Sequence, residues 1–249
     1  MQATLARLGI GLAIIIGGAS AVAANEYLLA DGKAWPGQIL TWRDGGQNTT
    51  YLRPLNVGDD IPRIQSLTRL ADGRLVFASG LDRSVMQLDA GRERRLHHGG
   101  GLVRQVRTDA DGALYWSGLE TPRDGNPLPD GFIYRLRPET NETETLLTFS
   151  QGDVGNDWWG AFDVRDGKVF VGTLRDRTRI YDVSQSPVRQ VCELPISATA
   201  FRFGPGNSLY ACDGQGVLYR FDDLARPGDI QEVLRSPTPF VDFVIDSER

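Results

Sequence analysis

The sequence predicts an all-β protein, a five-bladed β-propeller, and three observations lead to this prediction. A unit of four short strands recurs along the chain, with a tight turn of the Asp-Gly type between its first and second strands. Each unit takes up roughly 35–50 residues, which is the length of a propeller blade. The two ends of the chain supply complementary parts of one further unit. A β-sandwich, the alternative fold, explains neither the repeated turn nor the complementary ends.

The turn and the strand after it identify four units in chain order. Gly and Asn tolerate the positive φ of tight hairpin turns, so Asp-Gly or Gly-Asn between apolar runs indicates a hairpin. The repeated segments are 71–77, 110–116, 165–171 and 206–210. Third strands are expected at 84–88, 131–136, 179–183 and 216–221, and fourth strands near 94–96, 144–149, 188–194 and 230–234. We therefore expect complete blades at about 61–97, 101–149, 156–194 and 197–235.

The fifth blade is expected to combine the two ends of the mature chain. Residues 239–249 have the pattern of a first strand that no second strand follows. The start of the mature chain supplies the other three strands, at 26–30, 38–42 and 50–55. Joined in one sheet, 239–249 and 26–55 close the ring without an open seam, so residues 25–249 form a single propeller domain.

Residues 1–24 have the pattern of a cleaved signal peptide. Arg7 lies in a short leading segment, an apolar run at 10–16 follows, and small residues at 21–24 precede a mature start near Asn25. The alternative is a transmembrane anchor, but Gly17 and Gly18 interrupt a run that is too short to cross about 30 Å of hydrocarbon. We therefore expect a periplasmic or secreted protein that makes no stable membrane insertion.

Composition narrows the choice of partner. The chain carries 27 Lys+Arg against 32 Asp+Glu, a net charge of −5, and this mild acidic balance argues against nucleic acid as the partner. The 41% hydrophobic content is ordinary for a globular protein. The expected partner is therefore a small-molecule ligand or an exported protein, bound by a monomer.

The segment 209–222 (Leu-Tyr-Ala-Cys-Asp-Gly-Gln-Gly-Val-Leu-Tyr-Arg-Phe-Asp) resembles the blades of NHL-repeat propellers. It is also similar to the gluconolactonase-like and streptogramin-lyase-like families, and the likeness covers nearly all of the mature chain. The shared positions are turns and aromatic strands, so the resemblance implies a fold more specifically than an activity. The lactonase-like enzymes resemble six-bladed rings, whereas this chain yields five blades. Two function classes stay open: a non-catalytic binding module, and a metal-assisted lactone or ester hydrolase or lyase.

Ligands of propellers usually bind on one face of the ring, which we call the loop face. It gathers the loops between second and third strands and the connections from each fourth strand to the next blade. An acidic residue follows the second strand in every expected blade; these are Asp31, Asp82, Glu120, Asp176 and Asp213. The candidate ligand-binding residues of the loop face are Trp35, Asp82, Glu120, Arg123, Trp158, Asp176 and Asp213.

One connection on this face, 151–159, suggests a metal site. Asp153, Asn156 and Asp157 offer the oxygen ligands that Ca²⁺ or Mg²⁺ prefers, and Mn²⁺ or Zn²⁺ are further candidates. A bound cation would polarise a lactone or ester carbonyl. The resemblance to gluconolactonase-like propellers favours such a site, although that family's Glu-Asn-Asp ligand set does not map position by position onto this chain. The alternative is that these acids cap turns and pair with neighbouring arginines.

The two histidines suggest a different chemistry. His97 and His98 are expected in the connection between two blades, and a streptogramin-lyase-like enzyme carries a His general base in the mouth of its propeller. The resemblance therefore makes His98 a candidate catalytic residue. The glycines at 99–101 favour the alternative, a flexible bend with solvated histidines.

The tryptophans and cysteines each allow two interpretations. Trp35 and Trp158 are able to stack on a sugar or aromatic ligand, or to pack between blades, whereas packing is favoured for Trp159. Cys192 and Cys212 fall in strands of neighbouring blades, where an oxidising compartment favours a disulfide. The alternative is that both are small buried hydrophobic residues.

Overall fold

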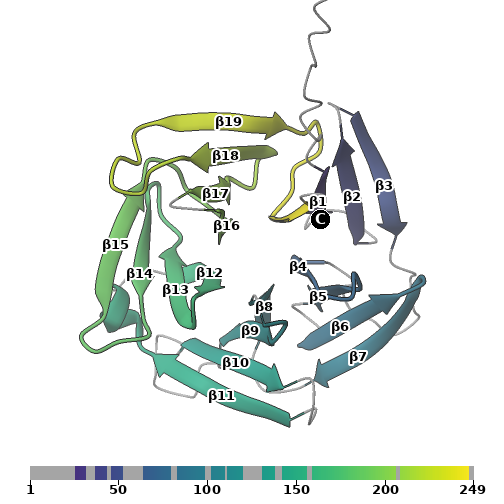
Figure 1. The fold of residues 1–249 in the computed structure, drawn as a ribbon, viewed down its shortest axis with the longest axis horizontal. Helices are drawn as coiled ribbons and strands as arrows, with labels where there is room; N and C mark the ends of the chain where they lie inside the picture. The colour runs from purple at the N-terminus through teal and green to yellow at the C-terminus, as the bar shows by residue number, and fades with distance from the viewer. Residues whose placement is uncertain are drawn as a thin grey trace, which may run out of the picture.

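The computed structural model describes residues 26–31, 37–43, 46–52, 64–79, 83–98, 102–109, 111–119, 131–137, 142–155, 159–205 and 208–246. Within these segments twenty strands form five four-stranded antiparallel sheets. The five sheets are arranged radially around a common centre (Figure 1). The prediction of an all-β, five-bladed propeller is confirmed.

Each blade runs from an inner strand at the centre to an outer strand at the rim (Figure 1). Blade 1 contains β20 (Asp242–Asp246), β1 (Glu26–Asp31), β2 (Gln38–Arg43) and β3 (Gly46–Leu52). Blade 2 contains β4 (Ser66–Arg69), β5 (Leu75–Ser79), β6 (Ser84–Asp89) and β7 (Arg92–His98). Blade 3 contains β8 (Leu102–Thr108), β9 (Leu114–Leu119), β10 (Gly131–Arg137) and β11 (Glu142–Phe149). Blade 4 contains β12 (Trp159–Arg165), β13 (Lys168–Thr173), β14 (Thr178–Asp182) and β15 (Arg189–Leu194). Blade 5 contains β16 (Ala200–Phe203), β17 (Leu209–Cys212), β18 (Val217–Phe221) and β19 (Ile230–Arg235).

The last strand of the chain closes the ring. β20 pairs with β1 in antiparallel register, from Glu26 opposite Asp246 to Ala30 opposite Asp242. β20 therefore becomes the inner strand of a blade whose other three strands come from the start of the described chain. The complementary pattern at the two ends has this physical meaning: each end alone would leave an unpaired strand edge.

The Asp-Gly turns adopt the backbone conformation that selects glycine. Gly73, Gly112 and Gly167 have φ values of 87°, 80° and 71°, and Asp166 before Gly167 has a φ of 51°. At Asp166-Gly167 the successive positive φ values match the right-handed twist of the paired strands and let the chain reverse in two residues. These turns lie on the face opposite the loop face, because they join first to second strands.

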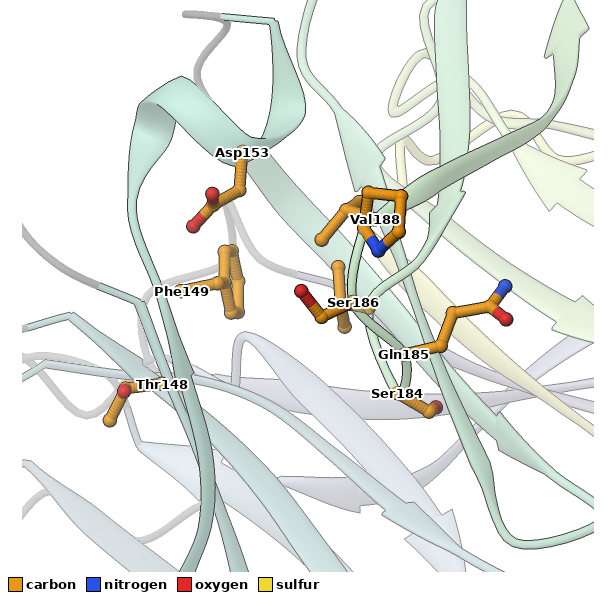
Figure 2. Close-up of a pocket in the computed structure, with 9 residues that line it drawn as sticks. Thr148, Phe149, Asp153, Ser184, Gln185, Ser186 and Val188 are labelled. Atoms are coloured by element: carbon orange, nitrogen blue, oxygen red, sulfur yellow. The ribbon is translucent and has the colours of Figure 1, made fainter.

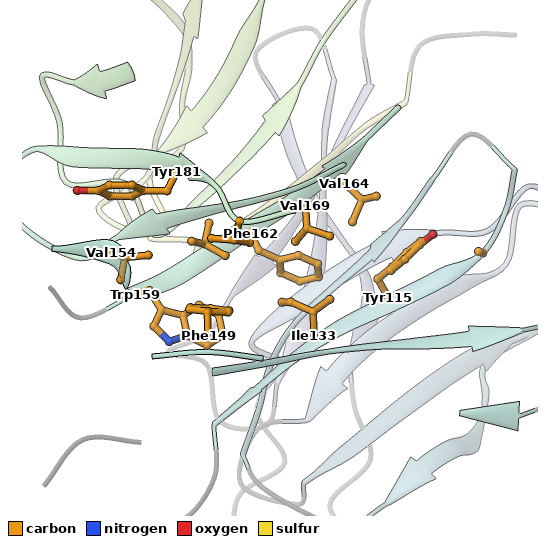
Figure 3. Packing of buried hydrophobic residues seen from close by; sticks show 12 residues of the cluster. Tyr115, Ile133, Phe149, Val154, Trp159, Phe162, Val164, Val169 and Tyr181 are labelled. Carbon is orange, nitrogen blue, oxygen red and sulfur yellow. The ribbon is translucent and has the colours of Figure 1, made fainter. Parts of the chain in front are cut away.

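Five hydrophobic clusters fill the five interfaces between neighbouring blades. The one between blades 3 and 4 packs Phe162 and Val169 of blade 4 against Tyr115 and Ile133 of blade 3 (Figure 3). The other four clusters join blades 1 and 2, 2 and 3, 4 and 5, and 5 and 1 in the same way. Burial of the apolar face of each sheet against the next is the main stabilising contribution in such a ring.

The described part of the chain contains one helical element, the short 3-10 helix η1 (Gln151–Val154) between blades 3 and 4. None of the described residues belongs to a helix long and apolar enough to cross a membrane.

Candidate functional site

Much of the predicted ligand-binding set lies on loops beyond the described residues. Trp35, Asp82, Glu120, Arg123, Asn156, Asp157 and Trp158 all fall there. Asp153, Asp176, Asp213, His98 and both cysteines are described.

Two of the described acids are occupied by their own turns. Asp213 Oδ1 accepts hydrogen bonds from the backbone N–H groups of Gln215 at 2.8 Å and Val217 at 3.2 Å. Asp153 Oδ2 accepts from the backbone N–H and the hydroxyl of Ser150, at 2.7 and 3.0 Å. Both carboxylates stabilise local turns, as the alternative interpretation of the sequence expected. Asp176, in the loop between β13 and β14, is exposed to solvent.

A resident metal ion finds no complete ligand set in the described part of the chain. No three His, Cys, Asp or Glu residues gather there. Asp153 is the one member of the predicted triad that is described, and one of its oxygens is already engaged by Ser150.

The histidines lie in a strand and not in a connection, which corrects the prediction from sequence. His97 and His98 are the last two residues of β7, the outermost strand of blade 2. His97 packs its ring on Trp116 of blade 3, with the ring centroids 4.8 Å apart. His98 Nδ1 forms a hydrogen bond with Ser84 Oγ at 3.1 Å across the strand pair. His98 thus reaches the loop face at the rim of the ring, away from the central channel.

The predicted disulfide does not form. Cys192 and Cys212 are both buried free thiols. Cys192 belongs to the core between blades 4 and 5, which Ala211 of β17 also enters. Cys212, the next residue after Ala211, faces the opposite core, between blades 5 and 1. Because successive residues of a strand point to opposite faces, the sheet of blade 5 separates the two sulfurs.

The centre of the ring holds a buried polar network that the sequence analysis missed. We call Ser66, Gln105, Arg107, Asp163, Arg202 and Asp242 the channel cluster. Every member lies on an inner strand, and together they come from all five blades. A signal was present in the sequence: Asp163, Arg202 and Asp242 each stand between two apolar residues in a first strand.

Arg107 is the hub of the channel cluster and is fully buried. Its Nη1 and Nη2 atoms donate to the two carboxylate oxygens of Asp242, at 2.8 and 3.3 Å. Nη1 also donates to Ser66 Oγ at 3.2 Å, and Nη2 donates to the Phe201 carbonyl at 3.5 Å. Nε faces Asp163 Oδ1 at 3.6 Å. These four partners belong to blades 1, 2, 5 and 4, so one side chain of blade 3 contacts every other blade.

Asp242 receives the densest set of donors in the channel cluster. Besides Arg107, its oxygens accept from the Ser66 hydroxyl and from the backbone N–H groups of Leu67 at 3.1 Å and Phe243 at 2.9 Å. A carboxylate with no exposed side-chain surface is stable in a protein only when paired and hydrogen-bonded in this way.

Burial shifts the titration of two other members of the channel cluster. Burial raises the pKa of Asp163 above its ordinary value, against the opposing effects of Arg107 and Arg202. Burial also lowers the pKa of Arg202 to about 10, to which the nearby charge of Arg107 adds. Both shifts have the same cause, the cost of holding a charge away from water.

A second link across the channel lies on the loop-face side of Arg107. Gln105 Nε2 donates to the Thr199 carbonyl at 2.9 Å, on the connection into blade 5. Gln105 Oε1 accepts from Arg107 Nη2 at 3.1 Å and from the Phe162 backbone N–H at 2.9 Å. Gln105 and Arg107 therefore form a polar, hydrogen-bonded floor across the centre of the ring, beneath the loop face.

A separate groove of about 610 Å³ lies between blades 3 and 4. The end of β11 and η1 form one wall, and the loop between β14 and β15 forms the other (Figure 2). Ser184, Gln185 and Ser186 line it opposite Thr148 and Asp153. Asp153 is the one described residue of the predicted site set that lines it.

Comparison with known proteins shows where this architecture recurs. No family model and no curated protein matches the sequence. Among solved structures, a gluconolactonase from Xanthomonas campestris is similar, with a TM-score of 0.54 and 16% identity over 82% of this chain and 71% of that one. This chain has a gluconolactonase-like β-propeller fold.

Two further structures share the gluconolactonase-like fold. One carries a provisional assignment as a gluconolactonase, with a TM-score of 0.50 and 15% identity over 89% of this chain and 84% of that one. The other is a protein of unknown function from Bacteroides caccae, with a TM-score of 0.52 and 12% identity over 86% of this chain and 73% of that one. At such identities the likeness concerns the fold, and activity has to be argued from the residues of this chain.

Proposed function

We propose that the protein binds a small molecule on its loop face, above the floor formed by Gln105 and Arg107. The observation that supports this most directly is the floor formed by Gln105 and Arg107, which ties non-neighbouring blades together under the loops. A rigid scaffold that carries variable loops over a polar floor is the usual arrangement of a ligand site in this kind of fold. An exported protein partner that docks on the same face is the other occupant of this proposal.

The experiment is a thermal-shift screen of sugars, sugar acids and lactones against the mature chain. A ligand at about one hundred times its dissociation constant stabilises the folded state by about 2.7 kcal/mol, which raises the Tm by several degrees in a protein of this size. Asp176→Ala on the loop face is expected to weaken binding. Asp166→Ala, an exposed acid of the same blade on the opposite face, is the matched control and is expected to leave binding unchanged. If Asp166→Ala weakened binding of a ligand and Asp176→Ala did not, the site would lie on the face opposite the loop face, and the proposal would be overturned.

Hydrolysis of a lactone or ester at the loop face is the second candidate function, and the likeness to a gluconolactonase favours it. Ca²⁺, Mn²⁺, Zn²⁺ or Mg²⁺ retained near one per chain, together with turnover of a lactone panel, would support it. Loss of both in an Asp153/Asn156/Asp157 triple-alanine variant would assign the metal to that connection. A metal-free chain that binds its ligand without turning it over supports the binding module.

A lyase that uses a His base receives less support from the geometry. His98 lies at the rim, held by Ser84, and not beside the channel. Undiminished activity of His98→Ala against any substrate found in the screen would remove this role altogether.

We also propose that the protein acts after export, as a periplasmic or secreted monomer. The support is the signal-like pattern of residues 1–24. Cell fractionation followed by N-terminal sequencing is expected to find a chain that starts near Asn25 outside the cytoplasm. Recovery of an uncleaved chain from the cytoplasm would overturn the proposal.

A further inference from the structure

Arg104 differs from the other arginines of the inner strands. It lies near the loop-face end of β8, one residue before Gln105 and three before Arg107. The pairing of β8 with β9 shifts here, since Val103 stands opposite Gly118 and Gln105 opposite Ser117. Arg104 is thus the extra residue of a β-bulge. Bulges often re-aim a side chain beside a functional site.

Arg104 is half-buried. Within the described part of the chain, no ion pair or hydrogen bond engages its side chain, whereas Arg107 and Arg202 both contact Asp242. Burial lowers the pKa of Arg104, and no nearby carboxylate opposes that shift. A charged side chain rarely leaves water without a counter-ion, so this cation lacks a partner of the kind that proteins normally supply.

The ion pairs around Arg107 point the same way. Within the described residues, Asp163 and Asp242 form their ion pairs with Arg107 and Arg202, and neither carboxylate pairs with Arg104. Both carboxylates are already engaged by Arg107 deeper in the channel. The charge of Arg104 is therefore not balanced by either of these carboxylates, and Arg104 lies near the end of β8 that leads to the loop face.

We infer that the loop face holds an oxyanion site centred on Arg104, which binds the carboxylate or phosphate group of a small molecule. A guanidinium matches both groups through paired N–H donors, and the partly desolvated setting strengthens such contacts. The ligand supplies the counter-ion that the chain does not.

This inference deepens the proposed function and rests on the same small-molecule site. The inference also predicts how the reaction product would bind if the protein is a hydrolase. Hydrolysis of a neutral lactone adds water across the acyl C–O bond and yields a hydroxyl and a carboxylic acid, which ionises to a carboxylate. Arg104 would then bind the product more tightly than the substrate, and the product would inhibit competitively.

The test measures binding by titration calorimetry at low ionic strength with three probes. Gluconate carries a carboxylate, sorbitol is its neutral polyol counterpart, and inorganic phosphate represents the other oxyanion. We expect gluconate or phosphate to bind and sorbitol not to bind. Arg104→Gln is expected to weaken oxyanion binding by about 10-fold to 100-fold, since hydrogen bonds to charged groups contribute about 1.5–3 kcal/mol. The oxyanion affinity of Arg104→Lys is expected to lie between those of the wild type and Arg104→Gln, because lysine keeps the charge and loses the paired N–H donors.

Two further measurements separate a binding role from a structural one. Arg92→Gln removes an exposed cation from β7 on the rim and is expected to leave binding unchanged. Without ligand, Arg104→Gln is expected to unfold at the same or a higher temperature than the wild type, because it removes an uncompensated charge. A lower Tm with unchanged oxyanion binding would show that Arg104 is structural, and would overturn the inference.

The outcomes also separate this inference from the proposed function. Binding of sorbitol or a lactone without binding of gluconate or phosphate overturns the oxyanion site and leaves the small-molecule site standing. Absence of binding by any compound of the screen overturns both.

Discussion

Two arginines three positions apart on β8 show how local partners decide what a side chain does. Arg107 is fully buried and is neutralised by Asp242 and Asp163, so it holds blades together. Arg104 is half-buried and has no carboxylate within the described chain, so it is available to a ligand. Residue type and strand are the same in both cases, and the placement of two aspartates on other blades makes the difference.

Replacement of the hub arginine is expected to destabilise the ring severely. Arg107→Leu removes the main cation of the buried Asp242 and Asp163 and leaves them with Arg202 alone, and removal of one partner of a buried ion pair costs about 3–5 kcal/mol. Urea unfolding followed by circular dichroism measures the loss. Arg137→Leu removes an exposed arginine that pairs with Glu144, and it is expected to cost less than about 1 kcal/mol. Equal losses in the two variants would contradict the role of the hub.

The raised pKa of Asp163 predicts a pH dependence of a definite sign. A carboxyl group whose pKa in the folded chain lies above its ordinary value of 3.8 binds its proton more tightly when folded than when unfolded. Its contribution to the unfolding free energy therefore falls as pH rises above that value. The side chain of Asp163→Asn does not titrate. The unfolding free energy of the wild type minus that of the variant is therefore expected to decrease as the pH rises above 3.8. Urea titrations across the pH range measure it, with Asp166→Asn as the exposed control; a flat or rising difference contradicts the prediction.

Both cysteines are expected to be unreactive in the folded protein. Burial raises the pKa of Cys192 to about 11 and that of Cys212 to about 12, so neither forms the thiolate that reacts with thiol reagents at neutral pH. A reagent such as DTNB is expected to detect no thiol in native protein and two after denaturation without reductant. If the reagent detected no thiol after denaturation without reductant, Cys192 and Cys212 would be joined in a disulfide, which contradicts the structure.

At the scale of single residues, the side-chain contacts across the channel were not predicted from the sequence. Side-chain pairing across the channel joins strands such as β8 and β20 that are far apart in the chain, and no local periodicity reveals such contacts. His97 and His98 were expected in the connection between two blades, whereas β7 continues to His98. The opposite orientations of Cys192 and Cys212 depend on strand register, which sequence spacing does not fix.

Strands were predicted far better than side-chain partners. Alternating apolar residues mark each strand, and Asp-Gly marks the reversal, so both signals lie within about ten residues of each other. The pairing of β20 with β1 followed from a different argument, the need of each chain end for a partner. These predictions succeeded because the strands of four blades follow one another directly in the chain. Only the blade that closes the ring combines the two ends of the described chain.

β20 is the element on which closure of the ring depends, and its central aromatic residue tests that dependence. Phe243 is fully buried in the core between blades 5 and 1. Phe243→Ala is expected to lower the unfolding free energy by about 3–5 kcal/mol, because it leaves a cavity at the closing interface. Ile230→Ala on the outer strand β19, where the side chain is 38% exposed, is the control, and its loss is expected to be below about 1 kcal/mol. A loss for Phe243→Ala no greater than for Ile230→Ala, measured by urea unfolding, would show that the interface tolerates an open seam.

The whole molecule is a closed ring in which the position of the chain ends is arbitrary. Glu26 and Asp246 stand opposite each other in the pairing of β1 with β20, so a short Gly/Ser linker is able to join them as a hairpin. A permuted chain that begins at Gly167 and ends at Asp166, within an exposed turn, is expected to keep the far-ultraviolet spectrum and to unfold cooperatively. A permuted chain that fails to fold, beside an unpermuted chain carrying the same linker sequence at its end, would show that the order of the blades matters.

The reach of Arg107 sets an upper limit on the number of blades. Duplication of one unit within the gene would enlarge the circle of inner strands and move Asp242 and Asp163 beyond one guanidinium. Arg202 would then be the one remaining cation of the channel cluster for two interior carboxylates, so a six-bladed descendant of this chain would first have to replace at least one of them. The sixth repeat and the loss of at least one of these charges are expected to appear together wherever this lineage has grown.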